Sequence, residues 1–142
     1  MSKTHRIACG IASQGLHEIT TEVKGVVSEF GPEDGLCTLY IPHTSASLTI
    51  QENADPAVLR DLENWLNRLV PEDDPLYEHT AEGPDDMPAH IKTSLLGNSI
   101  SIPIEDGKLA LGTWQGIYLG EHRKLGGTRK IIVTINGETR HQ

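Results

Sequence analysis

The feature that most constrains this chain is the alternation of apolar and polar residues over much of its length. Residues 18–23 alternate with a period of two, and residues 35–41 are apolar enough to be half or fully buried. A period of two places successive side chains on opposite faces of a strand, so we expect sheet to dominate the fold. The expected strands are residues 18–23, 35–41, 46–50, 99–104, 108–111, 116–119 and 130–135.

One hairpin is clear from its turn. Glu105, Asp106 and Gly107 separate the expected strands 99–104 and 108–111. Glycine adopts the positive φ angles that tight hairpin turns require without a steric penalty. These two strands are therefore predicted to pair with each other in antiparallel orientation.

Two helices are expected in the middle of the chain. Asp55 can accept hydrogen bonds from the first free amides of a helix, and Pro56 suits the first helical position. A shorter helix is predicted over residues 89–96, where Gly97 follows as a C-terminal cap. The leucines that support the first helix recur at helical spacing before Pro71 and are Leu59, Leu62, Leu66 and Leu69.

The segment between these helices, residues 71–88, is acidic and contains four prolines, so we expect no regular structure there. Strands and helices do not alternate regularly, which excludes a Rossmann-type sheet. A chain of 142 residues can bury a core without disulfides. We therefore predict one compact α+β domain over residues 1–142, with a largely antiparallel, sandwich-like or barrel-like sheet and two central helices.

Composition narrows the classes of function. The formal net charge of −8 at pH 7 argues against binding to DNA, RNA or an anionic membrane, because Lys and Arg hold those partners. No apolar run approaches the roughly 20 residues needed to cross a bilayer. The two cysteines, Cys9 and Cys37, lack metal-site spacing and are expected to be reduced thiols. These features together lead us to expect a cytoplasmic protein.

Three histidines form the main candidate site. His43 follows an expected strand in the sequence Pro-His-Thr-Ser, where Thr44 and Ser45 can donate hydrogen bonds beside its imidazole. His79 and His90 flank a loop stiffened by prolines. Three imidazoles that converge and leave one position open can hold a catalytic zinc ion. The simpler alternative is that His43 binds a backbone carbonyl and that the other two are ordinary loop and helix residues.

The remaining histidines are expected to lie outside this site. His5 and His141 are close to the chain ends, and His17 precedes an expected strand. His122 stands beside two basic residues, so we expect it to contact an anion rather than a metal ion.

A second candidate functional segment is Leu-Gly-Thr-Trp-Gln-Gly at residues 111–116. Its glycines allow the backbone to approach a ligand, and Gln115 offers both donor and acceptor groups. Trp114 can stack on a flat ring or, alternatively, pack into the core. The chain has no P-loop, GxGxxG, GxSxG or HExxH motif, which excludes the nucleotide-binding, α/β-hydrolase and zincin classes.

Five segments occur in a characteristic order, residues 42–49, 53–55, 82–92, 94–97 and 111–116. They carry Pro-His-Thr-Ser, Asn-Ala-Asp, Met-Pro-Ala-His and Gly-Thr-Trp-Gln-Gly. In these segments the chain resembles the YjbQ-like family, also called the secondary thiamine-phosphate synthase enzymes, from about residue 19 to residue 137. The resemblance implies a compact α+β fold with antiparallel sheet, a cyclic homotrimer and a pocket lined by the histidine motifs.

The resemblance also implies an activity on small phosphorylated metabolites. The reaction joins a pyrimidine-methyl diphosphate to a thiazole phosphate and yields thiamine phosphate and pyrophosphate. A divalent metal ion, first expected to be zinc, would be held by His43, His79 and His90. Glu82 lies between two of these ligands in the sequence and is the first candidate for a catalytic base. Asp86 stands where many relatives carry Asn, which adds a negative charge near the implied site.

The implied substrate contacts come from three other segments. Thr44, Ser45 and Lys92 would bind phosphate oxygens, while Trp114 and Gln115 would hold the heterocycle. Gln115 is therefore expected to act in catalysis together with the base. Because pyrophosphate is a good leaving group, this chemistry needs mainly placement and electrostatic stabilisation.

Two other classes of function remain open. A metal-dependent hydrolase of small phosphate esters would use the same three histidines to activate water. A non-catalytic homotrimer that binds a small molecule or a metal ion would use the histidine cluster only to stabilise its fold.

Overall fold

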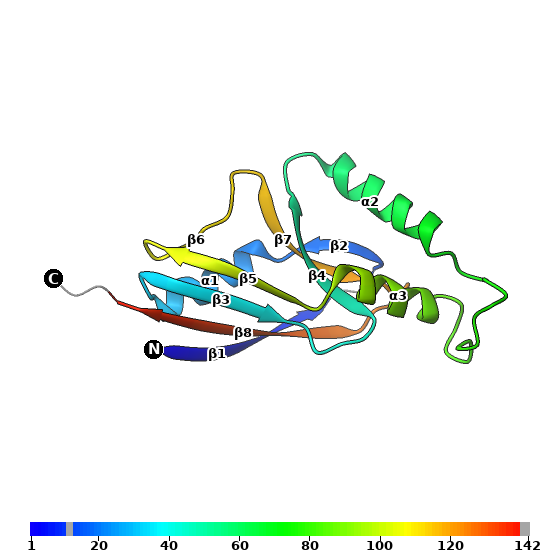
Figure 1. Cartoon of the computed structure of the whole chain (residues 1–142), viewed down its shortest axis with the longest axis horizontal. Helices are drawn as coiled ribbons and strands as arrows, with labels where there is room; N and C mark the ends of the chain where they lie inside the picture. The colour runs from blue at the N-terminus through cyan, green and yellow to red at the C-terminus, as the bar shows by residue number, and fades with distance from the viewer. Residues whose placement is uncertain (11–12, 140–142) are drawn as a thin grey trace.

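A five-stranded and a three-stranded sheet carry the fold in the computed structural model, which describes residues 1–10 and 13–139 (Figure 1). The larger sheet has the order β1-β8-β3-β5-β6 and the smaller one β2-β7-β4, and every pairing is antiparallel. The strands are β1 Ser2–Gly10, β2 Gly15–Glu18, β3 Asp34–Tyr40, β4 Ala46–Glu52, β5 Ser99–Glu105, β6 Lys108–Leu109, β7 Gln115–Glu121 and β8 Thr128–Glu138. The helices are α1 Thr20–Phe30, α2 Pro56–Leu69 and α3 Asp86–Leu96.

The core is built from the inward faces of the strands and from α1. Ile131, Val133 and Ile135 alternate along β8 and are fully buried, as are Cys37 and Leu39 on β3. This alternation is the period-two pattern of the sequence, realised as one face against the core. Both cysteines are free, and burial raises the pKa of the Cys37 thiol to about 11. The expected α+β fold with antiparallel sheet is therefore confirmed.

The expected strand over residues 18–23 is wrong. Strand β2 ends at Glu18, and α1 begins at Thr20. Val23 and Val27 are buried one helical turn apart, and Gly31 ends the helix in a left-handed conformation with φ 56°. The β-branched residues favoured a strand locally, but burial of one helical face against the sheets decides the outcome.

The two central helices are confirmed, with one shifted boundary. The side chain of Asp55 accepts a hydrogen bond from the amide of Ala57 at 2.9 Å, as expected for a cap of α2. Helix α3 begins at Asp86, three residues before the predicted start, and so includes the end of the acidic segment. The hairpin of β5 and β6 also forms, with its turn at Asp106 and Gly107.

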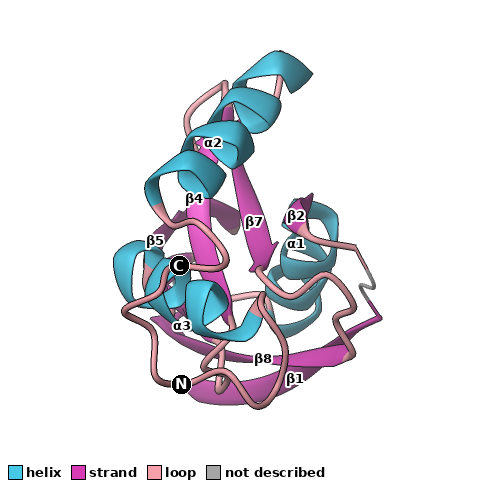
Figure 2. Ribbon diagram, turned by 90° about the vertical axis from the view of Figure 1, so that its right-hand side faces the viewer, coloured by secondary structure: helices cyan, strands magenta, loops and turns pink. Residues whose placement is uncertain are grey.

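Helix α2 projects from the body of the molecule at one end (Figure 2). Only Leu66 on this helix is buried, whereas Trp65 and Leu69 are 51% and 52% exposed. Helix α3 instead packs along β4 and brings its first turn close to the β7–β8 connection. None of the helices in the described residues is both long enough and apolar enough to cross a membrane. His141 lies outside the described residues.

Candidate metal site

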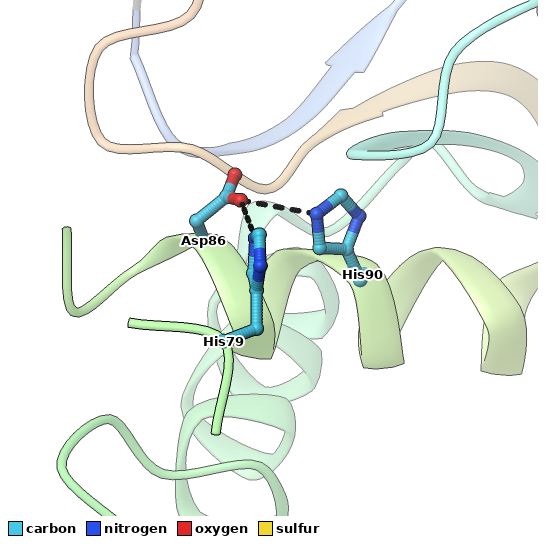
Figure 3. A group of neighbouring side chains, drawn as sticks. All are labelled: His79, Asp86 and His90. Carbon is cyan, nitrogen blue, oxygen red and sulfur yellow. Dashed lines mark hydrogen bonds and ion pairs between the residues drawn. The ribbon is translucent and has the colours of Figure 1, made fainter. Parts of the chain in front are cut away.

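Two of the three expected imidazoles meet at one carboxylate (Figure 3). His79 comes from the loop after α2, while Asp86 and His90 lie one helical turn apart on α3. Oδ2 of Asp86 is 2.6 Å from Nε2 of His79 and 3.0 Å from Nε2 of His90. The two imidazole ring centroids are 5.3 Å apart. We refer to His79, Asp86 and His90 as the His–Asp cluster.

A backbone contact determines which nitrogen of His90 faces the cluster. Nδ1 of His90 is 2.8 Å from the carbonyl oxygen of Thr44. A carbonyl oxygen only accepts, so Nδ1 of His90 donates to it and Nε2 is the nitrogen left to face the cluster. Nε2 lies 3.0 Å from the shared carboxylate oxygen of Asp86, which also only accepts, so Nε2–H donates to it and a bound metal ion would replace that proton. Metal-binding histidines typically show this arrangement, with the second ring nitrogen donating to a carbonyl.

Asp86 is held as a carboxylate by positive neighbours. Its side chain is 3% exposed, and Nη1 of Arg123 lies 2.8 Å from Oδ1. Burial alone raises the pKa of Asp86, but the hydrogen bond from His79 and the charges of His90 and Arg123 outweigh it, and the pKa lies below its usual value.

The His–Asp cluster fits a divalent metal ion. One ligand atom from each of its three residues lies within 4.8 Å of the other two. Ligand atoms that lie about 2.1 Å from a zinc ion are roughly 3.0–3.4 Å from one another. Moving each of the three ligand atoms by less than about 1 Å would therefore allow them to bind one ion. Two imidazoles and one carboxylate form the donor set of many catalytic zinc sites and of non-haem Fe(II) sites.

A cavity of about 330 Å³ adjoins the cluster and shares His90 with it. Thr44 and Ser94 contribute hydroxyl groups to its wall, and Asn98 contributes an amide. The hydroxyl oxygen of Thr93 is buried there without a hydrogen-bond partner among the described residues. The full lining is His43, Thr44, His90, Thr93, Ser94, Gly97 and Asn98.

His43 lines this cavity but does not join the cluster. Its Nε2 accepts a hydrogen bond from the backbone amide of Lys130 at 3.0 Å. Its Nδ1 lies 3.4 Å from Nη1 of Arg129. Burial and the charge of Arg129 lower the pKa of His43, so the ring stays neutral. The structure thus brings together His79 and His90 with Asp86, while His43 stands on the cavity wall.

Ser45 belongs to a buried polar network behind the cavity. Nη2 of Arg129 donates to Oγ of Ser45 at 2.9 Å and to Oε2 of Glu121 at 2.6 Å. Nε of Arg129 donates to the other oxygen of Glu121 at 2.8 Å. Glu121 is fully buried, and this paired geometry satisfies its charge.

Lys92 is buried between α2 and α3 rather than lining the cavity. It is 1% exposed, and its Nζ donates to Oδ1 of Asn67 at 2.6 Å. Burial lowers its pKa, although the nearby Glu63 and Glu72 act in the opposite direction. These contacts link the two helices.

Trp114 and Gln115 lie at the other end of the small sheet. Ala46 of β4 pairs with Glu121 at the cavity end of β7, whereas Glu52 pairs with Gln115. Six residues of strand separate these pairs by about 20 Å. Trp114 is 63% exposed and therefore is not part of the core.

His122 is fully buried, so the expected contact with an external anion is wrong. Its Nε2 lies 2.8 Å from Oγ of Ser47. Asp86 is the one cluster residue that the sequence did not assign as a ligand, and Arg123 beside it was not singled out either. The spacing of Asp86 and His90, four residues apart, could have revealed Asp86 if the helix had been started three residues earlier.

Comparison with models of known protein families shows which family this chain belongs to. The family model described as UPF0047 protein YjbQ-like matches residues 6–138. The chain belongs to this family. The UPF0047 protein sll1880 of Synechocystis is 50% identical over 138 residues, which cover 96% of this chain and 94% of that protein. The YjbQ protein of Salmonella typhimurium is 54% identical over 126 residues, covering 88% and 91% of the two chains.

Solved structures of the family share the fold described above. A YjbQ/UPF0047 protein from Clostridium acetobutylicum superposes with a TM-score of 0.84 at 42% identity, covering 93% of this chain and 99% of its own. A YjbQ-like protein from Sulfolobus solfataricus, at 24% identity, has a TM-score of 0.85 and covers 97% of this chain and 100% of its own. The second likeness concerns the fold alone.

Proposed function

We propose that this protein is a metal-dependent enzyme that acts on a small phosphorylated metabolite. The observation that carries the proposal is the His–Asp cluster, in which Thr44 orients His90 so that its remaining nitrogen meets Asp86 and His79. Zinc is the first expected ion, because two imidazoles and one carboxylate suit it. When bound, the ion would supply positive charge to a phosphate or diphosphate group.

The adjoining cavity supports a phosphate-bearing substrate. Among the described residues that line it, none is a carboxylate, and Thr44 and Asn98 offer hydrogen-bond donors, while the Ser94 hydroxyl donates to the carbonyl of His90. The His43 ring adds no free donor to the cavity, because its Nε2 accepts from the amide of Lys130 and its Nδ1 faces Nη1 of Arg129. These two donors and the lack of a carboxylate among the described lining residues favour an anionic group in this space.

The specific reaction we propose first is the thiamine-phosphate synthase coupling. The thiazole nitrogen attacks the methylene carbon of the pyrimidine-methyl diphosphate, the C–O bond breaks, and pyrophosphate leaves with the electron pair. The cavity donors would hold the departing group. In this proposal Glu82, which is exposed in the loop before α3, would act as the catalytic base.

The position of Trp114 and Gln115 favours a second candidate, a hydrolase that takes one phosphate ester. These residues lie about 20 Å from the cavity along the strands, so one subunit does not assemble a heterocycle site beside the cluster. A hydrolase needs only the cluster, the cavity donors and water.

We also propose that the chain forms a homotrimer in the cytoplasm. The half-exposed Trp65 and Leu69 on α2 support an association of subunits, because large apolar side chains are commonly covered in assemblies. The free thiols of Cys9 and Cys37 support a reducing compartment.

Elemental analysis and product analysis test the proposal together. The wild-type protein and a His17→Ala control should each retain one zinc ion per chain after dialysis, whereas His90→Ala should retain none. His17 is a suitable control because it lies on β2 and binds the carbonyl of Ser13. Full zinc occupancy in His90→Ala would refute the metal site.

Product analysis then separates the two reactions. A synthase releases thiamine phosphate and pyrophosphate only when both halves are supplied, whereas a hydrolase releases phosphate from a single ester. Zinc binding without either product would overturn the enzymatic part of the proposal and leave a binding protein.

A further inference from the structure

We propose that Arg123 is the positioning residue of the His–Asp cluster; this inference rests on the proposed metal site. The two oxygens of Asp86 have different partners. Oδ2 faces both imidazoles, while Oδ1 is 2.8 Å from Nη1 of Arg123. By holding Oδ1, the guanidinium fixes the carboxylate plane and directs the other oxygen to the position that an ion would share.

The same guanidinium binds two further points of the segment that leads into α3. Its Nε lies 3.0 Å from Oδ2 of Asp85, and its Nη2 donates to the carbonyl oxygen of Glu82 at 3.0 Å. Three nitrogens of one planar group thus bind Glu82, Asp85 and Asp86, at the end of the loop and the start of α3. Arginine suits this task because its donors are arranged in a rigid fork, which the single ammonium of lysine does not reproduce.

Arg123 is itself anchored in the buried part of the molecule. Its backbone amide donates to Oε2 of Glu121 at 3.1 Å, and Glu121 is bound on both oxygens by Arg129. The next backbone amide, of Lys124, donates to Oδ2 of Asp85 at 2.9 Å. These bonds fix the connection between β7 and β8, and with it Arg123, relative to the sheet and to the start of α3.

The two carboxylates at the start of α3 need a cationic partner, which Arg123 supplies. Asp85 and Asp86 are adjacent carboxylates that are 9% and 2% exposed. Asp85, at the N-cap position of α3, makes no side-chain cap hydrogen bond. Removing the arginine would leave two buried negative charges with one cationic partner fewer, and buried charges are tolerated only when paired. The carboxylate would then no longer be held in one orientation.

The test measures metal affinity and coordination in position 123 variants. Arg123→Ala and Arg123→Lys are compared with the wild type by competitive zinc titration and by the visible absorption spectrum of the Co²⁺ form. We expect zinc affinity to fall about 10- to 100-fold in Arg123→Ala, the range typical for residues that orient ligands. In Arg123→Lys, which retains the charge, we expect partial recovery of affinity and a Co²⁺ spectrum that differs from wild type.

Lys124→Ala is the matched control. The Lys124 side chain pairs with Glu72 at 3.0 Å and its contact with Asp85 is made by the backbone, so this variant should keep wild-type affinity and spectrum. Wild-type affinity and an unchanged spectrum in both Arg123 variants would overturn the inference and leave the metal site intact. If Arg123→Ala does not fold, the spectrum of Arg123→Lys decides alone. Absence of zinc binding in the wild type would instead overturn the proposed function, and this inference with it.

Discussion

His90 and Thr44 are joined by a hydrogen bond of 2.8 Å between an imidazole nitrogen and a backbone carbonyl 46 residues away in the chain. This bond connects α3 to the loop before β4 and sets the orientation of the imidazole ring. It also places the remaining ring nitrogen toward Asp86. The cluster is therefore positioned by the tertiary fold rather than by local sequence.

Asp86 should contribute directly to metal affinity. Asp86→Asn preserves the size of the side chain but removes the negative charge shared by the two imidazoles. We expect the zinc affinity, measured by competitive titration, to fall at least about 10-fold, because a neutral amide oxygen is a weaker ligand than a carboxylate. An unchanged affinity would mean that the carboxylate only supports the imidazoles.

The free energy of unfolding should depend on pH through His122. Burial lowers the pKa of this ring from 6.5 to about 4, and the charges of Lys92 and Arg129 also lower it, although Glu121 acts in the opposite direction. Between these values the unfolded chain binds the proton and the folded chain does not. The free energy of unfolding should therefore decrease by about 3 kcal/mol from His122 as the pH falls from 6.5 to 4.

Urea unfolding of wild type and His122→Gln across this range measures the effect. The variant should show a shallower slope against pH, while the smaller contribution of His43, whose pKa burial also lowers, remains in both proteins. Equal slopes in the two proteins would show that His122 is accessible to protons in the folded state.

Gly126 should be intolerant of any side chain. A Cβ at this position would overlap Oε1 of Glu121, which the bonds from Arg129 hold in place. Gly126→Ala should cost about 2–4 kcal/mol of stability, since the buried ion pair has to shift. A Cβ at the neighbouring Gly127 meets nothing within 4 Å, so Gly127→Ala serves as the control. Thermal unfolding measures both, and equal melting temperatures would contradict the prediction.

Lys92 should act on stability rather than on phosphate binding. Both carboxylate oxygens of Glu63 are buried without a hydrogen-bond partner among the described residues, and Lys92 is a nearby cation. Lys92→Ala should lower the free energy of unfolding by about 3–5 kcal/mol, because it leaves a buried charge and a cavity. Lys92→Met fills the cavity but still removes the positive charge, so its loss of stability measures the cost of the unpaired buried charge alone. Weakened phosphate binding with unchanged stability would restore the role that the family resemblance implies.

Several local features of the fold could be predicted because their causes lie within a few residues. The alternation in β3 and β8 determines which face is buried, and Asp55 with Pro56 marks the start of α2. Helix α1 was missed because its valines suit a strand as well as a helix, and only packing against the sheets distinguishes the two.

The sequence by itself determined the strands after residue 34, the family and the histidines worth examining, whereas β1 was not predicted and α1 was taken for a strand. Tertiary structure alone decided that Asp86, rather than His43, is the third member of the cluster, and that Arg123 holds it in place. It also decided that Trp114 is remote from the cavity. The reason is physical: periodicity and capping act over a few residues, whereas the direction of a side chain depends on which distant elements pack beside it.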